Sequence, residues 1–407
     1  MRNVDYLILG GGIAGTTAAE EIRRKDENSS ITIITEEADR LYSRVLLPHF
    51  LRNENTPESL FVRPVDSYPQ KNLELLTSTK ITKVDTQNRQ VTTDKEEFSY
   101  KKLLIATGGK VNRLQTPGAE LPGVVYLRTL TDAKKIKEQM ALSKNAIVIG
   151  GGFIGIEFAQ SFIKNNLKTT SIVLEKSFWE SVVGENSAKL LTQILTELGV
   201  TVLTESEVVE FSGEGKLQGV KLKNGQTLPA DIAGVGVGIH MELSHLQDSG
   251  LMINKGVLTN EYLETSVPSV WAAGDIAEFK DLVTGKVHQL GNWSNASAQG
   301  RAVGINMAGE RIAFQTTSMY SINIFESNFS FLGDPVVDEQ TEVIERGDLA
   351  IKKLGRLLIR NDVIVGASLI NLPLERNVLT NLIKNKTKIT SSKAKLSDFS
   401  FDLSAIS

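Results

Sequence analysis

The sequence predicts an α/β protein in which one strand–turn–helix unit occurs twice and an α+β domain follows. Two glycine-rich segments carry this prediction: Gly10–Gly15 follows the apolar run Val4–Leu9, and Gly150–Gly155 follows the apolar run Ala146–Ile149. Each segment stands between a strand-like and a helix-like run, which is the setting of a Rossmann-like dinucleotide-binding unit. From residue 319 onward the apolar runs alternate as in antiparallel strands.

The first motif has a glycine at each of the three positions that such a turn requires, Gly10, Gly12 and Gly15. The first glycine permits the tight turn, the second leaves room for a pyrophosphate, and the third lets the helix pack on the strand. The helix that follows, from Ala14 to about Arg24, offers free N–H groups to the phosphates at its N-terminus, which includes Ile13.

The second motif repeats this pattern with Gly150, Gly152 and Gly155. Phe153 and Ile154 open its helix, which is predicted over residues 153–165. Two dinucleotides in one chain indicate that electrons pass from one to the other.

An acidic residue follows the next strand in both units. In the first unit this acid is Glu36, with Glu37 as the alternative, and in the second unit it is Glu175. A carboxylate at this position accepts hydrogen bonds from ribose hydroxyls and repels a 2′-phosphate, so the second site is predicted to prefer NADH over NADPH. Lys176 weakens that preference, because its ammonium group could lie over a phosphate.

Other patterns predict the remaining elements. The predicted strands are 73–77, 81–84 and 90–93 (all antiparallel), 102–106, 231–237, 320–325, 350–354, 357–360 and 363–370. Residues 267–275 have the pattern of a strand followed by a turn. The further predicted helices are 187–198, 295–307 and 375–384. Asn224-Gly225 predicts a hairpin with a type I′ turn, and Asn361-Asp362 a second tight turn.

The composition is that of an ordinary globular protein, with 41% apolar residues, 23% charged residues and a formal net charge of −3. No basic excess points to nucleic acid, and no apolar run has membrane-spanning length. We expect a cytoplasmic protein, since Met1–Val4 leads directly into the first strand and leaves no room for a signal peptide. The chain has no cysteine, and its four histidines lack metal-ligand spacing, so no metal site is expected.

In combination, these motifs resemble the FAD/NAD(P)-dependent pyridine nucleotide reductases of the two-dinucleotide-fold type. The resemblance is closest to the rubredoxin and ferredoxin reductases and to the flavin half of NADH-dependent nitrite reductases, and it extends to about residue 370. The motifs that carry it are Gly10-x-Gly12-x-x-Gly15, Tyr42-Ser43-Arg44-x-x-Leu47, Ala106-Thr107-Gly108, Gly150-x-Gly152-x-x-Gly155 with Glu157, Trp271-Ala272-Ala273-Gly274-Asp275, and Trp293-x-Asn295-Ala296 with Gln299-Gly300.

The resemblance implies three domains, in which the second nucleotide unit is inserted into the first. The FAD-binding domain comprises residues 1–118 and 247–318, the NAD(H)-binding domain residues 119–246, and the C-terminal α+β domain residues 319–407. It also implies that several residues outside the glycine motifs contact the cofactors. These are Glu36, Arg44, Ala106, Thr107, Gly108, Gly274, Asp275 and Trp293 for FAD, and Glu175 and Gly236 for NAD(H).

The resemblance further implies a catalytic pair. Many relatives have lysine at the position of His49, and that lysine pairs with the acid that is Glu157 in this chain. We therefore expect His49 and Glu157 to meet where flavin and nicotinamide adjoin.

The expected activity is the transfer of hydride from NADH to FAD, followed by electron transfer to a small protein such as rubredoxin or a ferredoxin. Without cysteine, the chain cannot pass electrons through a thiol. Five lysines near the C-terminus could steer an acidic partner: Lys384, Lys386, Lys388, Lys393 and Lys395. Two alternatives stay open, an NADH oxidase or diaphorase that reduces oxygen or quinones, and a redox sensor that binds FAD and NADH without turnover. Formation of a homodimer is also left open.

Overall fold

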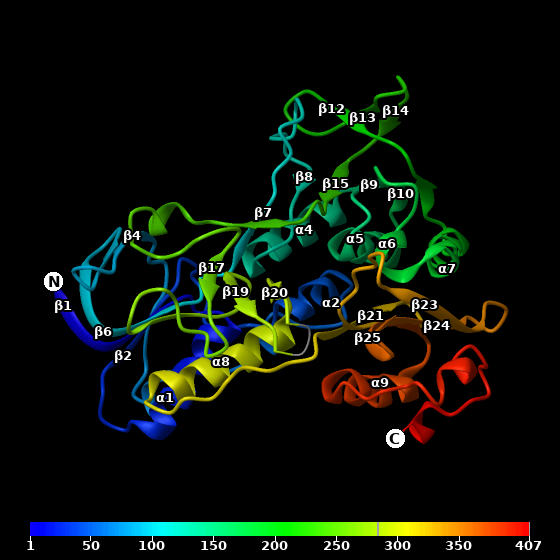
Figure 1. Cartoon of the computed structure of the whole chain (residues 1–407). Coiled ribbons are helices and arrows are strands. Elements are labelled where there is room, and N and C mark those ends of the chain that lie inside the picture. The colour runs from blue at the N-terminus through cyan, green and yellow to red at the C-terminus, as the bar shows by residue number, and fades with distance from the viewer. Residues whose placement is uncertain (283–284, 407) are drawn as a thin grey trace. The chain divides into compact units, whose positions relative to one another are not determined.

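The computed structural model describes residues 1–282 and 285–406 of the chain, which divides into two compact units (Figure 1). Unit 1 consists of Met1–Arg44, Pro57–Lys110 and Ile239–Thr316. Unit 2 consists of Val45–Thr56, Val111–Gly238 and Thr317–Ser407. The division into three domains with the boundaries given above stays a prediction.

The main sheet of unit 1 has the strand order β3-β2-β1-β6-β5-β4, and β18 also pairs with β6. Its strands are β1 (Arg2–Leu9), β2 (Ile31–Ile34), β3 (Glu74–Leu76), β4 (Ile81–Asp85), β5 (Gln90–Thr93), β6 (Glu97–Ile105) and β18 (Val270–Ala272). β18 lies parallel to β6, so the chain returns to this sheet late in the sequence, as predicted.

One strand direction in this sheet was predicted wrongly. β4 and β5 are antiparallel as expected, but β3 lies parallel to β2, with Thr32 opposite Glu74. The alternating pattern of residues 73–77 indicates a strand and gives no information on its direction. The direction follows from the long connection after β2, which contains short helices and brings the chain back to the start of the sheet.

Helix α1 (Ile13–Lys25) packs against helix α8 (Trp293–Met307) along a seam of small residues (Figure 1). A Cβ atom on Gly300 would overlap the carbonyl oxygen of Ala14, and one on Gly304 would lie 2.7 Å from the carbonyl oxygen of Ala18. The two backbones therefore touch directly, which only glycine permits at these positions.

The smaller elements of unit 1 are η2 (Glu58–Leu60), α3 (Ser67–Gln70), β7 (Gly109–Val111), β16 (Ile239–Met241), η3 (Ser244–Leu246), β17 (Val257–Thr259), β19 (Ala277–Lys280) and β20 (Val287–His288).

Unit 2 contains a parallel sheet with the order β11-β10-β9-β15-β8. Its strands are β8 (Val124–Val125), β9 (Asn145–Ile149), β10 (Lys168–Ile172), β11 (Thr201–Leu203) and β15 (Ile232–Val235), and its helices are α2 (Leu47–Leu51), α4 (Leu130–Ala141), α5 (Phe153–Lys164), α6 (Glu180–Val183) and α7 (Glu185–Glu197). The short 3-10 helix η1 spans Arg44–Leu46. The helices predicted over 153–165 and 187–198 are thereby confirmed within two residues at each end.

A small antiparallel sheet follows, made of β12 (Val208–Ser212), β13 (Gly219–Leu222) and β14 (Thr227–Pro229). The predicted hairpin is present, but its type I′ turn was wrong. Gly225 has φ +89°, whereas Asn224 is not among the residues with positive φ. A type I′ turn needs positive φ at both central residues, and the longer connection here removes that need.

The C-terminal part of unit 2 is an antiparallel sheet with the order β21-β22-β25-β24-β23. Its elements are β21 (Met319–Ile324), β22 (Ser327–Gly333), β23 (Glu342–Asp348), β24 (Lys353–Arg360), β25 (Val363–Ile370), α9 (Pro373–Asn385), η4 (Lys393–Lys395) and η5 (Leu403–Ala405). The two short strands predicted within 350–360 form the single strand β24. β23 was missed, because four charged residues interrupt its apolar pattern.

None of the described helices is long and apolar enough to cross a membrane.

Replacing Gly300 with alanine is expected to lower the stability of unit 1. The higher helix propensity of alanine would stabilise α8 by about 1 kcal/mol, but its Cβ would collide with the backbone of α1. Overpacking of this kind destabilises a protein by about 1–3 kcal/mol, and by more where the backbone must move. Urea unfolding should therefore show a lower free energy of unfolding for the variant. Ala298→Ser, on the exposed face of α8, is the control. If Gly300→Ala unfolds at the same urea concentration as the parent, the close contact between α1 and α8 is contradicted.

Candidate functional site

The first glycine turn in unit 1 has the backbone that a dinucleotide turn requires. Gly10 has φ +120°, and a Cβ atom there would overlap the carbonyl oxygen of Ala106. A Cβ on Gly15 would overlap the carbonyl oxygen of Gly10, so α1 lies directly on the turn. Gly12 faces open space, with nothing within 4 Å of its Cβ position. The turn is therefore closed at its first and third glycines and open at its second.

The N-terminus of α1 is free to bind an anion. No side chain caps it at Gly12, and no acidic residue stands in its first turn. Ile13 and Ala14 begin the helix, as predicted. The unpaired N–H groups and the helix dipole favour negative charge at this position. The observed geometry thus fits the pyrophosphate of a dinucleotide.

The two acids after β2 have different partners. The Glu37 carboxylate accepts hydrogen bonds from the hydroxyl of Tyr42 and from the guanidinium of Arg44. Glu36 is 56% exposed, and its carboxylate lies 3.6 Å from Nζ of Lys110. Glu36 therefore keeps most of its hydrogen-bonding capacity for a ligand, whereas the Glu37 carboxylate is already paired.

Arg44, for which the resemblance implies a place at the FAD phosphates or the flavin edge, belongs to a charged cluster with Tyr42 and Glu37. Its Nη1 lies 2.9 Å from the Tyr42 hydroxyl. Burial acts to lower the pKa of the Arg44 guanidinium, but the negative charges of Glu37 and Asp275 raise it overall. Asp275 thus lies in the electrostatic field of Arg44, so the structure brings together two predicted site residues that are far apart in the sequence.

The segment around Gly274 and Asp275 returns to the first glycine turn. Gly274 has φ +81°, and its Cβ position lies 3.3 Å from the Cβ of Ala14. Its backbone N–H donates a hydrogen bond of 2.7 Å to Oε1 of Gln299 on α8. Gln299 therefore fixes the loop that carries Asp275, a function that the sequence motif alone did not suggest.

Several buried polar atoms near this turn have no partner within the described residues. They include Oγ1 of Thr107, Oδ1 of Asn295 and Nε2 of Gln299. Ala106, Thr107 and Gly108 follow β6, and Gly108 has φ +68°. Since buried polar groups are normally hydrogen-bonded, these atoms fit the polar edges of FAD. The residues of unit 1 are thus compatible with that cofactor.

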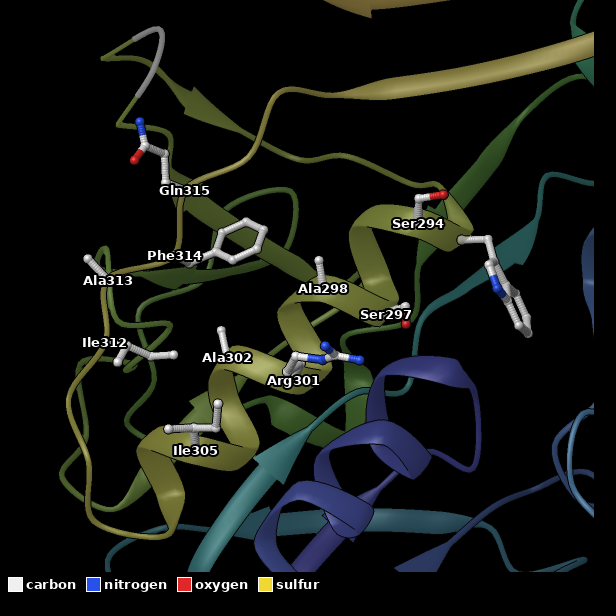
Figure 2. A pocket seen from close by; sticks show the side chains of 11 residues that line it. Ser294, Ser297, Ala298, Arg301, Ala302, Ile305, Ile312, Ala313, Phe314 and Gln315 are labelled. Carbon is white, nitrogen blue, oxygen red and sulfur yellow. The ribbon is translucent and has the colours of Figure 1, made fainter. Parts of the chain in front are cut away.

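Trp293 begins α8 and lines a hollow of about 510 Å³ along one face of the helix. Ala298, Ala302 and Ile305 border this hollow from α8, and Phe314 borders it from the segment that passes the helix (Figure 2). The remaining lining residues are Ser294, Ser297, Arg301, Ile312, Ala313 and Gln315. Trp293 therefore lies at a concave surface rather than in the core.

The second glycine turn, in unit 2, repeats the geometry of the first. Gly150 has φ +105°, and its Cβ position lies 2.5 Å from the carbonyl oxygen of Gly236. A Cβ on Gly155 would overlap the carbonyl oxygen of Gly150, whereas the nearest atom to that of Gly152 lies 3.7 Å away. Phe153 and Ile154 begin α5, which has no side-chain cap and no acid in its first turn. This turn too is open at its second glycine, and it fits a dinucleotide such as NAD(H).

Glu175 follows β10 and is exposed, and its carboxylate forms no ion pair with any residue that the structure describes. Lys176 next to it is also exposed, and its charge acts on Glu185 at the start of α7. Glu175 is therefore free to accept hydrogen bonds from a ribose.

The predicted pair of His49 and Glu157 is not a direct contact, because Arg52 stands between them. Nη1 of Arg52 lies 2.5 Å from the Glu157 carboxylate, and its Nε lies 3.1 Å from Glu54. His49 Nδ1 lies 2.7 Å from the other oxygen of Glu54. The four side chains form one network in unit 2, in which Arg52 replaces the expected histidine as the partner of Glu157.

This network places a carboxylate in a largely buried position. The side chains of Arg52 and Glu157 are 6% and 15% exposed. Burial raises the pKa of the Glu157 carboxyl, and the nearby charge of Arg52 opposes that rise without cancelling it. Arg52 and Glu54 were missed in the sequence, although Arg52 is three residues after His49 and close to it in the same short segment.

Two of the five lysines near the C-terminus have polar partners within unit 2. Nζ of Lys393 lies 2.6 Å from Glu342 and 3.2 Å from Asp362. Nζ of Lys388 donates a hydrogen bond of 2.6 Å to a backbone carbonyl. Part of the positive charge is therefore compensated within unit 2.

Replacing Arg52 with methionine is expected to destabilise the protein by about 3–5 kcal/mol at pH 8, because it leaves the Glu157 carboxylate buried without a counterion. This destabilisation should become smaller as the pH falls to 5. The folded-state pKa of Glu157, already raised by burial, would rise further above its unfolded value, and the neutral acid carries no such penalty. Urea unfolding at the two pH values measures this difference.

The double variant Arg52→Met/Glu157→Gln is the control for that experiment. It removes the buried carboxylate together with its partner, so its stability relative to the parent should vary less with pH. Equal destabilisation of Arg52→Met at pH 5 and pH 8 would contradict the proposed ion pair.

Comparison with known proteins agrees with this geometry. The family described as pyridine nucleotide-disulphide oxidoreductase matches residues 4–300. The NAD(P)H nitrite reductase of Bacillus subtilis (strain 168) is 29% identical over 395 residues, which are 96% of this chain and 48% of that protein, so the chain spans about half of that relative. The rubredoxin-NAD(+) reductase of Pseudomonas putida is 27% identical over 381 residues, 93% of this chain and 98% of that protein. The crystal structure of a ferredoxin reductase from Rhodopseudomonas palustris has a TM-score of 0.92 at 26% identity, covering 98% of this chain and 99% of that chain.

These matches confirm the predicted resemblance to rubredoxin and ferredoxin reductases and to nitrite reductase. They also confirm the mixed α/β fold, the class of NAD(P)H-dependent flavin oxidoreductases, and FAD and NAD(P)H as cofactors. The chain belongs to the pyridine nucleotide-disulphide oxidoreductase family.

Proposed function

We propose that this chain takes hydride from NADH onto FAD and passes the electrons to a small electron-transfer protein of the rubredoxin or ferredoxin type. The observation that carries the proposal is the pair of glycine turns, one in each unit, in a chain without cysteine. Two open turns allow one dinucleotide in each unit. The absence of a thiol means that no disulphide within this chain can take the electrons onward, despite the name of the family.

In unit 1, the residues around the first turn are proposed to hold FAD. The N–H groups at the start of α1 bind the pyrophosphate, Glu36 binds the adenosine ribose, and Asp275, fixed by Gln299, binds a ribityl hydroxyl. Bound FAD supplies the chemistry that connects a hydride donor with a one-electron acceptor. The residues of the chain position the cofactor and exclude water from it.

In unit 2, the start of α5 and Glu175 are proposed to hold NADH. Gly236, which follows β15, packs against Gly150 and Gly155, and we assign to its backbone a place beside the nicotinamide half of the dinucleotide. Glu157 lies one turn into α5, and we assign to it and His49 the role of setting the charge near the reacting atoms. Arg52 holds the Glu157 carboxylate in place. Oriented binding of this kind supplies much of the rate enhancement, because the encounter becomes effectively unimolecular.

The assignment of a protein acceptor is supported by the similar proteins, which include a rubredoxin reductase and a ferredoxin reductase. Both are matched over nearly their whole length. Nitrite reductase extends well beyond the matched region, so its activity on nitrite is not carried over.

A second candidate function is the direct reduction of a small organic acceptor such as a quinone. The hollow beside Trp293 favours it, since its volume of about 510 Å³ is in the usual range of small-molecule sites, about 300–1,000 Å³. Seven apolar residues line it, together with Ser294, Ser297, Arg301 and Gln315.

An acceptor screen on the FAD-loaded protein with NADH tests the proposal. We expect the value of kcat/KM for rubredoxin or a ferredoxin to exceed that for a quinone or oxygen by about 100-fold or more, which corresponds to about 2.8 kcal/mol of transition-state binding. Absorbance of the carrier protein measures the first two acceptors, and an oxygen electrode the last.

The outcome of the screen separates the candidates. Fast oxygen or quinone reduction without a carrier protein would replace the leading proposal by the second candidate. Binding of NADH without reduction of any acceptor would indicate a sensor instead of an enzyme.

Glu175 is predicted to set the preference for NADH. The carboxylate would lie next to the 2′-phosphate of NADPH, so kcat/KM should favour NADH by roughly 10- to 100-fold, or about 1.4–2.8 kcal/mol. Glu175→Ala should reduce this ratio severalfold, while Glu214→Ala, which changes an exposed acid in the connection between β12 and β13, should leave it unchanged. A preference of the parent for NADPH would refute the assignment.

A further inference from the structure

Trp179 has an unfavourable backbone conformation for a bulky residue. It stands before α6 with φ 53° and ψ 17°, in the left-handed region. Large side chains rarely adopt these angles, and they persist only where the surroundings fix them. The backbone N–H groups of Val182 and Val183 both donate to the Trp179 carbonyl, at 2.7 and 2.9 Å, so the strained residue also starts the helix.

The indole ring of Trp179 lies in an aromatic cluster within unit 2. Its centroid is 4.7 Å from that of Phe153, 5.6 Å from that of Phe331 and 6.0 Å from that of Phe329. Phe153 is the first residue of α5, directly after Gly152, whereas Phe329 and Phe331 belong to β22. One ring therefore connects the glycine turn of the second dinucleotide site with the C-terminal sheet.

The preceding residue, Phe178, contacts the same turn. It is fully buried, and its Cδ1 lies 3.4 Å from the Cβ position of Gly151. Two consecutive aromatic residues thus pack against the residues on either side of Gly152. The segment that begins at Glu175 is held on the glycine turn by this pair.

Arg356 of β24 fixes the same segment a few residues further along. Its Nη1 donates a hydrogen bond of 2.8 Å to the carbonyl oxygen of Val182. Gly184 lies against its side chain, since the Cβ position of Gly184 is 3.1 Å from Cδ of Arg356. The C-terminal sheet therefore contacts the segment after Glu175 at two points, Trp179 and Val182.

We propose that Trp179 is a positioning residue for the NAD(H) site: it holds residues 175–184 on the glycine turn, from the C-terminal sheet, so that Glu175 is fixed in place for the adenosine ribose. The inference rests on the proposed function of this site and adds to it that the C-terminal sheet sets its affinity. A loop that is already ordered loses less conformational entropy when the ligand binds. Without the ring, that entropy would have to be lost on binding.

The test is the affinity for ADP-ribose, the part of NADH that contains no nicotinamide, measured by calorimetry on the FAD-loaded protein. Trp179→Ala is expected to raise the dissociation constant about tenfold, through lost preorganisation. The KM for NADH should rise similarly, while kcat at saturating NADH and the FAD content stay near those of the parent, because only uniform binding is removed.

Two variants separate positioning from general stability. Trp179→Phe should bind ADP-ribose within about twofold of the parent, because it restores an aromatic ring, and the indole Nε1 has no hydrogen-bond partner among the described residues to lose. Leu379→Ala creates a cavity in the buried face of α9 and should lower the melting temperature with no change in ADP-ribose affinity.

Arg356→Met provides an independent variant if Trp179→Ala does not fold. It removes the hydrogen bond to Val182 and should raise the dissociation constant about threefold. Parent-like affinity of Trp179→Ala, or of Arg356→Met if only the latter folds, would overturn the proposal, as would an equal loss in Leu379→Ala. If the parent binds no ADP-ribose, the NAD(H) site itself is refuted, and the role of Trp179 with it.

Discussion

Direct contact between backbones at the two glycine turns is the constraint on which the rest of the structure depends. At Gly10 the carbonyl oxygen of Ala106 occupies the place of a side chain, and at Gly150 the carbonyl oxygen of Gly236 does the same. These contacts bring the ends of neighbouring parallel strands together at one edge of each sheet. They also direct the N-termini of α1 and α5 to that edge, where no side chain caps them. Each site is thus a consequence of close packing before any polar residue is considered.

Electrostatics then decides which polar residues remain available. Glu36 and Glu37 are neighbours in the sequence, but only Glu37 is paired with Arg44 and accepts a hydrogen bond from Tyr42. Glu157 has a cation at hydrogen-bond distance, whereas Glu175 has none among the described residues. The acids of the two units thereby acquire different roles: some maintain the local structure, and others stay exposed to a ligand.

The local features of the fold could be predicted from the sequence, because their determinants are adjacent residues. The glycine turns, α5, α7 and the strand Val363–Ile370 depend on patterns within a few residues. The direction of β3 depends on a connection of about forty residues, and the partner of Glu157 depends on how a short distant segment packs. The sequence shows that His49, Arg52 and Glu54 are close together, but not which of them contacts α5.

The same distinction holds for the candidate sites. Gly12, Gly152, Glu175 and Gln299 all belong to patterns that the sequence shows, whereas the hydrogen bond from Gly274 to Gln299 and the packing of Trp179 are visible only in the structure. Gln299 acts on a loop from another element, and Trp179 acts through residues of β22 that come about 150 positions later in the sequence. Pattern recognition finds the groups that face a ligand more readily than the groups that support them.

The late return of the chain to unit 1 has a consequence for biosynthesis. β18 pairs with Leu103–Ile105 of β6, and β5 pairs only with the opposite end of that strand, at Glu97–Ser99. During translation, the apolar edge of β6 therefore stays unpaired until residues 270–272 have left the ribosome, after the whole inserted segment. Such long-range pairing slows folding and leaves strand edges open to aggregation. Strands β8–β15 of unit 2 are synthesised before β18, whereas β22 and β24, which contact residues 175–184, are synthesised after it. Each of the two units therefore depends on residues that leave the ribosome only after part of the other unit has been made.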